Sequence, residues 1–253
     1  MILAIDVGNS TVSFGFFDED RLAHKFTSAS RVESAPDEII SFLSPLMMRA
    51  GITWSDISSI VISSVVPSLV HVFFEAFGPL VAGSPLLVSS RLKLNVKVEY
   101  KTPDTLGGDR IAASCAAYEM SGGPVAVIDF GTATTVTVVD AEGNLTGGAI
   151  APGLVTGYEA LTSKTAGLPY AGLTFPRSAV GRTTSECIQS GLIFGHAAMA
   201  DGLLKRVREE MGGSLKIVAT GGLAGMVVLQ MEEQAEIVPD LTLKGLKLIA
   251  SIN

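Results

Sequence analysis

Two short strings in this sequence place a carboxylate directly after an apolar strand. They read ILAIDVGNSTVSFGFFD, beginning at Ile2, and VAVIDFGTATTVTVVD, beginning at Val125. In each, an Ile-Asp pair ends the apolar run, and a glycine and small polar residues precede a second, alternating strand. A carboxylate in so apolar a setting is costly unless it is paired, hydrogen-bonded or next to a cation. Asp6 and Asp129 are therefore the first candidates for chemistry.

The residues that follow each acid are suited to phosphate. Glycine lets a ligand approach main-chain N–H groups closely, and hydroxyl and amide side chains add neutral donors. The small polar residues are Asn9, Ser10, Thr11, Thr132, Thr134 and Thr135. A hairpin tip of this composition predicts phosphate binding, with the acid holding a hydrated Mg²⁺ ion. The alternative is an ordinary Asx-turn at each aspartate; the presence of two copies favours phosphate.

A charged pair follows two glycines in GGDRIAAS, at the start of a predicted helix. Asp109 is a favoured N-cap residue, and that role alone would explain it. The functional interpretation makes Asp109 a base for a substrate hydroxyl and Arg110 a bidentate partner for an anionic group. Gly107 and Gly108 favour this second interpretation, because they allow close backbone access that a cap does not require.

Two more motifs lie at helix or turn starts. In GRTTSECIQSG, Thr183 and Glu186 fit a capping box, which leaves Thr184 either to face a ligand or without a role. In ATGGLAG, which begins at Ala219, glycines after a strand can cradle a nucleoside or phosphate, or form a plain connector. The three histidines are not spaced as metal ligands, so we expect them at the surface or in the core.

The composition narrows the class of protein. The length of 253 residues, with 47% hydrophobic residues, predicts two domains. Only 17% of residues are charged, which is typical of a chain that buries surface against a partner, and the net charge of −7 argues against a nucleic-acid partner. Cys115 and Cys187 belong to no CxxC pair, so we expect buried, reduced thiols in the cytoplasm. The apolar stretch from Val65 contains Glu75, prolines and glycines, which predicts a helix and a strand and not a membrane span.

The order of predicted elements occurs twice. A β-hairpin turning at residues 18–21 and a third strand precede a helix capped by Ser34; a strand, a helix, a strand and an alanine-rich helix follow. The pattern restarts at Val125 with a hairpin turning at residues 140–144, and it ends with a helix from about residue 240. We therefore expect a duplicated α/β fold, with domains at residues 1–120 and 121–253 and a ligand cleft between them.

Taken together, these motifs resemble a known family. The paired DVGNS and DFGTATT hairpins and the late TGG turn are similar to the superfamily of acetate and sugar kinases, heat-shock chaperones and actin (ASKHA). Within it, type III pantothenate kinase is the family that the chain resembles over nearly its whole length, in DVGNST, VISSVVP, GGDRIA, IDFGTATT, GGAIAPG, GRTTSECIQSG and TGGLAG. The resemblance implies two ribonuclease H-like (actin-like ATPase) domains and ATP-dependent phosphorylation of pantothenate to 4'-phosphopantothenate, the first step of coenzyme A biosynthesis.

The resemblance also implies residue roles. Asp109 would match the catalytic proton acceptor, and Asp129 the ligand of a potassium or ammonium ion. The pantothenate pocket would comprise Tyr100, Gly107, Gly108, Asp109, Arg110 and Thr184. The ATP site would comprise Asp6, Val7, Gly8, Asn9, Ser10, Thr11, Val12, Ser13 and Thr132, with Mg²⁺. The resemblance implies a homodimer. Together with the composition, we expect a cytoplasmic protein with no membrane or nucleic-acid partner.

Two departures from the family pattern are small. GGDR stands where GADR is more usual, and Ser10 stands where threonine is more usual. We expect neither to abolish activity. Three alternatives remain at this level: an ASKHA phosphotransferase acting on another small hydroxylated acid, sugar or polyphosphate; a chaperone-like ATPase, for which 253 residues leave no room for a peptide-binding domain; and a non-catalytic regulator of the same fold.

Overall fold

The chain folds into two compact units, seen in a computed structural model that describes residues 1–81, 83–164 and 172–253. Unit 1 comprises Met1–Met120 together with Asp240–Asn253, and unit 2 comprises Ser121–Pro239. The sequence placed the whole stretch 121–253 in the second domain. The structure assigns the last fourteen residues to unit 1 instead, because the helix that they form packs on the sheet of that unit.

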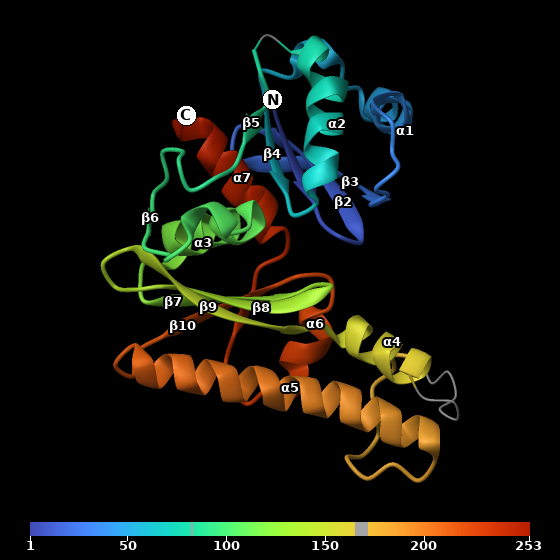
Figure 1. Cartoon of the computed structure of the whole chain (residues 1–253), viewed down its shortest axis with the longest axis vertical. Coiled ribbons are helices and arrows are strands. Elements are labelled where there is room, and N and C mark those ends of the chain that lie inside the picture. The colour runs from blue at the N-terminus through green and yellow to red at the C-terminus, as the bar shows by residue number, and fades with distance from the viewer. Residues whose placement is uncertain (82, 165–171) are drawn as a thin grey trace. The chain divides into compact units, whose positions relative to one another are not determined.

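Unit 1 is built on a five-stranded mixed sheet (Figure 1). Its strands are β1 (Ile2–Val7), β2 (Thr11–Asp18), β3 (Arg21–Ala29), β4 (Ser59–Ser64) and β5 (Leu86–Leu87). The spatial order is β3-β2-β1-β4-β5. Strands β1, β2 and β3 form an antiparallel meander, whereas β4 runs parallel to β1 and β5 runs parallel to β4. The predicted hairpin and third strand are confirmed.

One face of this sheet carries the apolar core of unit 1. Alternate residues of the strands, such as Leu3, Ile5 and Phe14, pack with Leu43 and Phe73 from helices α1 (Pro36–Ala50) and α2 (Pro67–Phe77). Strand side chains alternate between faces, so the intervening positions point away from this core. The prediction that Ser34 caps α1 is wrong: the helix begins after Ala35, whose N–H donates to Glu38 Oε2 at 3.2 Å.

Two helices belong to the opposite face of the unit 1 sheet. Helix α7 (Leu241–Ile252) packs on β1, β2 and β4, and Leu243 reaches Gly15 on β2. Helix α3 (Gly108–Ser121) lies against α7, where a Cβ on Gly245 would come within 1.8 Å of the Ala112 carbonyl oxygen. Only a glycine permits so close an approach of two helix backbones.

Unit 2 repeats the sheet of unit 1 (Figure 1). Its strands are β7 (Val125–Phe130), β8 (Ala133–Val139), β9 (Asn144–Pro152), β10 (Lys216–Thr220) and β11 (Glu236–Ile237). Within the unit their order is β9-β8-β7-β10-β11, with an antiparallel meander and then two parallel pairings. This matches β3-β2-β1-β4-β5 position by position, which confirms the predicted duplication of an α/β fold.

A long helix covers one face of the unit 2 sheet. Helix α5 (Thr184–Glu210) contributes Ile193 and Leu204 to a core with Ile128, Phe130 and their neighbours. The short helix α6 (Ala224–Val227) joins the same core. Helix α4 (Leu154–Lys164) was not anticipated, since its sequence LVTGYEALTSK carries a weak apolar pattern and an internal glycine.

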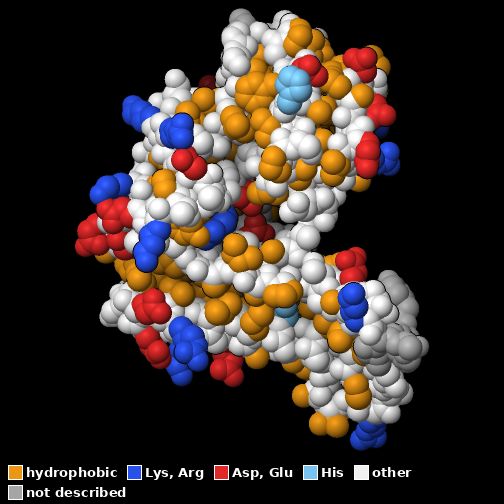
Figure 2. All heavy atoms as spheres, in the orientation of Figure 1, with side chains coloured by type: hydrophobic (Ala, Val, Ile, Leu, Met, Phe, Trp, Pro, Cys, Tyr) orange, Lys and Arg blue, Asp and Glu red, His pale blue; other side chains and the backbone are white. Residues whose placement is uncertain are grey.

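The remaining elements are short. They are β6 (Lys97–Val98) and the 3-10 turns Trp54–Asp56, Gly78–Leu80, Pro103–Thr105 and Val228–Gln230. The face of unit 1 in Figure 2 carries apolar side chains over α1 and α2, with charged residues scattered around them. Among the residues that the structure describes, no helix is long and apolar enough to span a membrane.

Candidate active site

Asp6 lies at the end of β1, on the sheet face that α7 and α3 cover. Its neighbours Ile5 and Val7 point into the α1–α2 core, so the Asp6 side chain points to the other side. The register pairs Asp6 with Ser13 on β2 and with Ser63 on β4. Register partners share a face and lie about 5 Å apart between strands. A carboxylate thus lies between two serines near the end of the central strand of the sheet.

The predicted phosphate loop, residues 6–13, has two kinds of side chain. Val7 and Val12 are buried in the core of unit 1, so only their backbone groups can meet a ligand. Asn9, Ser10 and Thr11 are exposed at the hairpin tip, where the N–H of Gly8 donates to the Thr11 carbonyl at 2.9 Å. Polar groups therefore gather at the tip, while the valines anchor it.

Asp109 lies in the first turn of α3, whose first residue is Gly108. It therefore lies inside the helix and not at the flanking N-cap position. Its Oδ1 atom is buried and has no hydrogen-bond partner. Burial raises the pKa of the Asp109 carboxyl, and the N–H and the positive charge of Arg110 oppose that rise. An unpaired buried carboxylate oxygen costs free energy and is a ready acceptor for a proton.

Arg110 is buried, with 9% of its surface exposed. Its guanidinium carbon lies 5.9 Å from the centre of the Tyr100 ring, a cation–π geometry that fixes the side chain. A buried guanidinium held over an aromatic ring is pre-arranged to bind a carboxylate. The structure brings Tyr100 and Arg110, two of the predicted substrate residues, together.

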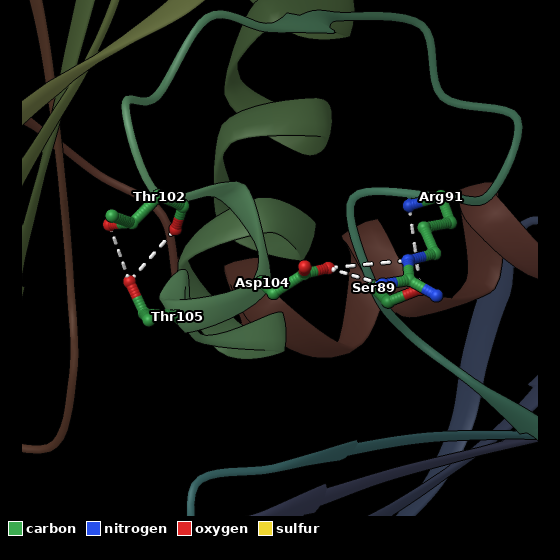
Figure 3. A network of polar contacts seen from close by, with 5 residues as sticks. All are labelled: Ser89, Arg91, Thr102, Asp104 and Thr105. Atoms are coloured by element: carbon green, nitrogen blue, oxygen red, sulfur yellow. Dashed lines mark hydrogen bonds and ion pairs between the residues drawn. The ribbon is translucent and has the colours of Figure 1, made fainter.

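The segment that leads into α3 is braced by side-chain contacts (Figure 3). Arg91 donates through Nε and Nη2 to Asp104 Oδ1 at 3.2 and 3.0 Å. The hydroxyls of Thr102 and Thr105 lie 2.8 Å apart, and Thr105 Oγ1 also donates to the Thr102 carbonyl oxygen. These contacts span the residues between Tyr100 and Gly107, so they support the turn from which Asp109 and Arg110 project.

Ser63 is a polar residue of this face that sequence reasoning missed. It is fully buried, and its Oγ atom has no hydrogen-bond partner. A Cβ built on Gly108 would lie 3.3 Å from that Oγ atom, so the start of α3 packs directly on the serine. Because Ser63 is also the register partner of Asp6, it joins the hairpin acid to the Asp109 turn. The only sequence signal is a serine pair that ends the apolar strand VISS.

Asp129 has the equivalent place in unit 2. It pairs in register with Thr135 on β8 and with Thr220 on β10. The glycine turn after β10 closes over it: Gly221 has φ of +93°, and a Cβ there would lie 2.4 Å from Asp129 Oδ1. The predicted TGG site therefore abuts the second hairpin acid. A carboxylate, two threonine hydroxyls and a close backbone form an oxygen-rich cradle that a side chain at residue 221 would fill.

Thr132 is exposed at the tip of the second hairpin. Its carbonyl oxygen accepts from the Gly153 N–H at 3.1 Å and from Thr156 Oγ1 at 2.6 Å. A Cβ on Gly153 would come within 2.4 Å of the same carbonyl oxygen, which explains the glycine that ends GGAIAPG. The start of α4 thereby holds the tip in place and leaves the Thr132 side chain exposed.

Thr184 is the first residue of α5 and is exposed. Thr183 caps the helix, as predicted, by accepting from the Glu186 N–H at 3.2 Å. Glu186 in turn accepts from the Arg182 N–H at 2.7 Å and not from the Thr183 N–H. Only one of the two hydrogen bonds of the predicted capping box is therefore formed. The capping role of its neighbour leaves the Thr184 hydroxyl pointing to solvent at a positive helix end.

The cysteines and histidines are not at these sites. Cys115 is buried in α3, and burial raises the pKa of its thiol to about 12. Cys187 is exposed, so the prediction that it is buried is wrong: only one side of α5 packs on the sheet. His196 is a core residue whose Nε2 lies 2.8 Å from Thr134 Oγ1. The described residues contain no group of three or more His, Cys, Asp or Glu side chains placed to hold a metal.

Comparison with known proteins identifies the family. The family description "Type III pantothenate kinase" matches residues 2–206. The type III pantothenate kinase of Thermomicrobium roseum is 40% identical over 247 residues, covering 98% of this chain and 95% of that protein. The enzyme of the same name from Shouchella clausii is 38% identical over 255 residues and covers both chains completely.

Solved structures support the fold. A conserved putative Baf family transcriptional activator from Campylobacter jejuni is similar with a TM-score of 0.60 and 18% identity, covering 98% of this chain and 97% of that one. An inorganic polyphosphate/ATP-glucomannokinase from an Arthrobacter species is similar with a TM-score of 0.52 and 15% identity, covering 100% of this chain and 99% of that one. At these identities the likeness concerns the fold, which is that of actin-like ATPases.

Proposed function

The chain belongs to the type III pantothenate kinase family, which phosphorylates pantothenate in coenzyme A biosynthesis, and we propose how its residues divide that work. The observation that supports the assignment best is the continuous strip on one face of the unit 1 sheet. It runs from Asp6 through Ser63 and Gly108 to Asp109. The hairpin that we assign to phosphate and the buried Asp109 carboxylate therefore belong to one compact unit.

Asp109 is the proton acceptor in this proposal. Its unpaired Oδ1 atom would accept the proton of the pantothenate hydroxyl as that oxygen attacks the γ-phosphate of ATP. Phosphoryl transfer depends mainly on positioning and charge, so the carboxylate also orients the attacking oxygen. Burial raises the pKa of Asp109, and this makes it a better base than an exposed aspartate.

Arg110 binds the pantothenate carboxylate in this proposal. An acidic protein needs a local cation for an anionic substrate, and the guanidinium is already fixed over the Tyr100 ring. Gly107 lacks a side chain beside the Asp109 carboxyl, and Gly108 lacks one beside Ser63, which supports the assignment of both glycines to the substrate turn. In unit 2 we assign Thr184 to pantothenate, since its exposed hydroxyl has no capping role.

The first hairpin is assigned to ATP. Asp6, Gly8, Asn9, Ser10, Thr11 and Ser13 would offer side-chain or backbone groups, and Val7 and Val12 backbone groups alone. From unit 2 we assign Thr132 to the same nucleotide. Mg²⁺ neutralises phosphate charge when it is bound, and a half-buried carboxylate flanked by hydroxyls fits a hydrated ion. Asp6 would hold it, with Ser13 beside it on the neighbouring strand.

Asp129 is assigned to a monovalent cation, K⁺ or NH4⁺. Its surroundings fit a partly dehydrated ion that takes several oxygen ligands: the Asp129 carboxylate, the Thr135 and Thr220 hydroxyls and the backbone at Gly221. The ion would keep Asp129 ionised and stiffen the turn of unit 2 around it.

We further propose a cytoplasmic homodimer. The low charged fraction of 17% supports it, as do apolar side chains left exposed in each unit, among them Met48, Ile150 and Val180. The proposed cytoplasmic location fits an enzyme that consumes ATP, because ATP is abundant in the cytoplasm.

An ADP-release assay tests the function. The purified protein with Mg²⁺ and potassium should release ADP with pantothenate and not with acetate, glucose or mannose. Phosphorylated product should appear in equal amount by mass spectrometry. ADP release with a sugar and none with pantothenate would contradict the assignment.

A further inference from the structure

Two buried polar atoms at one turn of unit 1 lack partners and are complementary. Four buried side-chain atoms of the described residues have no hydrogen-bond partner: Ser63 Oγ, Asn95 Oδ1, Asp109 Oδ1 and Ser114 Oγ. Buried polar groups are nearly always paired, so each exception calls for an explanation. Ser63 offers a hydroxyl donor, and ionised Asp109 offers an acceptor.

Each atom lies beside one of two consecutive glycines. A Cβ on Gly107 would lie 2.3 Å from Asp109 Oδ1, and a Cβ on Gly108 would lie 3.3 Å from Ser63 Oγ. The turn that separates the hydroxyl from the carboxylate therefore carries no side chain. Glycine has wide conformational freedom, so this turn carries no side chain that would oppose a small local movement.

Ser63 is itself held rigidly. It is a fully buried residue of β4, paired in register with Asp6 at the phosphate hairpin. The next residue, Ser64, turns its hydroxyl to the backbone of Val66, accepting from the N–H at 3.1 Å and donating to the carbonyl at 2.9 Å. Ser64 therefore has a structural role in the turn after β4, whereas the Ser63 hydroxyl makes no hydrogen bond with the described residues.

We propose that Ser63 is a positioning residue for phosphoryl transfer, whose hydroxyl donates a hydrogen bond to the Asp109 carboxylate in the substrate-bound enzyme. The inference rests on the proposed role of Asp109 as proton acceptor. When substrate seats against this turn, a small movement brings Asp109 Oδ1 to Ser63 Oγ. A carboxylate oxygen has two lone-pair sites, so Oδ1 accepts from the serine at one of them and faces the pantothenate hydroxyl with the other. The serine then fixes the direction from which the carboxylate receives the proton.

The test compares Ser63→Ala with Ser114→Ala. Both serines are fully buried and unpaired in unit 1, but Ser114 lies further along α3, away from the carboxylate. Removing an unpaired buried hydroxyl relieves a cost, so neither variant should melt below the parent protein. Ser63→Ala should lower kcat about tenfold, as expected for one hydrogen bond to a charged group. KM for ATP should not change in Ser63→Ala, and kcat should not change in Ser114→Ala.

A double-mutant cycle separates positioning from a general structural effect. In an Asp109→Asn background, Ser63→Ala should cost no further activity, because the group that it positions has lost its function. Ser63→Cys, which conserves size, replaces the alanine variant if the latter does not fold. A folded Ser63→Ala enzyme with the kcat of Ser114→Ala, or equal losses in both backgrounds, overturns the inference. If Asp109→Asn itself keeps full activity, the proposed proton acceptor is wrong instead.

Discussion

The two halves of this chain share a sheet but differ in what touches their central acid. Asp6 and Asp129 each end the first strand of a meander, and each pairs with a hydroxyl residue on both sides. In unit 1 the start of helix α3 packs on Ser63, the strand neighbour of Asp6, and this helix start carries the buried Asp109. In unit 2 a glycine turn presses backbone against Asp129.

The proposed assignments give the two halves of the duplicated fold different functions, and this difference in neighbours is their basis. The strands determine where a carboxylate emerges, and the segment that returns to the strand edge determines its neighbours. A helix start adds a second acid and a guanidinium, which suits proton transfer and anion binding. A glycine turn adds only backbone oxygen and N–H groups, which suits an ion. The predictions below test this division.

The largest effect is expected at the acid found in unit 1 alone. Asp109→Asn preserves size and polarity but cannot accept a proton, so kcat should fall on the order of 10²–10⁴-fold. Steady-state ADP release checks this, with circular dichroism to establish that the variant is folded. Turnover near that of the parent in a folded variant would reduce Asp109 to a residue of the first helical turn.

The glycine turn of unit 2 should tolerate no side chain. In Gly221→Ala the new Cβ meets Asp129 Oδ1 at 2.4 Å and the Phe130 backbone at 2.7 Å, at a φ of +93°. We expect a loss of stability of at least ~1 kcal/mol, and a weaker response to potassium. Gly222→Ala is the matched control, since a Cβ there meets nothing within 4 Å. Thermal unfolding measures both; similar melting temperatures for the two variants would exclude a tight turn.

Arg110→Lys should weaken substrate capture and not chemistry. Lysine keeps the charge but loses the planar fork and its stacking on Tyr100, so KM for pantothenate should rise roughly tenfold with little change in kcat. Arg21→Lys is a suitable control, because that arginine forms an exposed pair with Asp18 at the turn between β2 and β3. An unchanged KM in Arg110→Lys would remove Arg110 from the pocket.

The monovalent cation in the buffer should change the rate of the enzyme through the proposed site at Asp129. Replacing sodium by potassium or ammonium at constant ionic strength should raise activity severalfold, because potassium sheds water more readily. Asp129→Ala should abolish the difference and retain some nucleotide binding, measured by calorimetry with ATP and Mg²⁺. Equal rates of the parent enzyme in sodium and potassium would return Asp129 to a magnesium or turn role.

The smallest effect is a gain in stability at neutral pH. Burial raises the pKa of Asp109 above 3.8, so the folded protein holds this proton more tightly than the unfolded chain does. Ionisation therefore opposes folding as the pH rises through the folded-state pKa. Asp109→Asn should melt slightly above the parent at pH 7, and the gap should narrow as the pH falls toward 3.8. A lower melting temperature for the variant at pH 7 would contradict this.

Much of the fold was predictable because its signals are local. Apolar alternation and turn residues marked both hairpins, and the alanine-rich run marked α3. Predictions from local patterns failed where the sequence signal of an element is weak, or where the burial of a side chain depends on which side of a helix packs against the sheet. Helix α4 has little apolar periodicity, and the prediction of a buried Cys187 failed because sequence alone does not say which side of α5 meets the sheet.

The sequence by itself determined the strands, both hairpin acids, the Asp-Arg pair at the start of α3 and the family to which the chain belongs. These depend on residues close together in the chain. The tertiary structure alone decided that α7 returns to unit 1, that the TGG turn abuts Asp129, and that Ser63 meets the glycines before Asp109. Each of these is a contact between segments far apart in sequence, set by the register of parallel strands and the packing of helices on them.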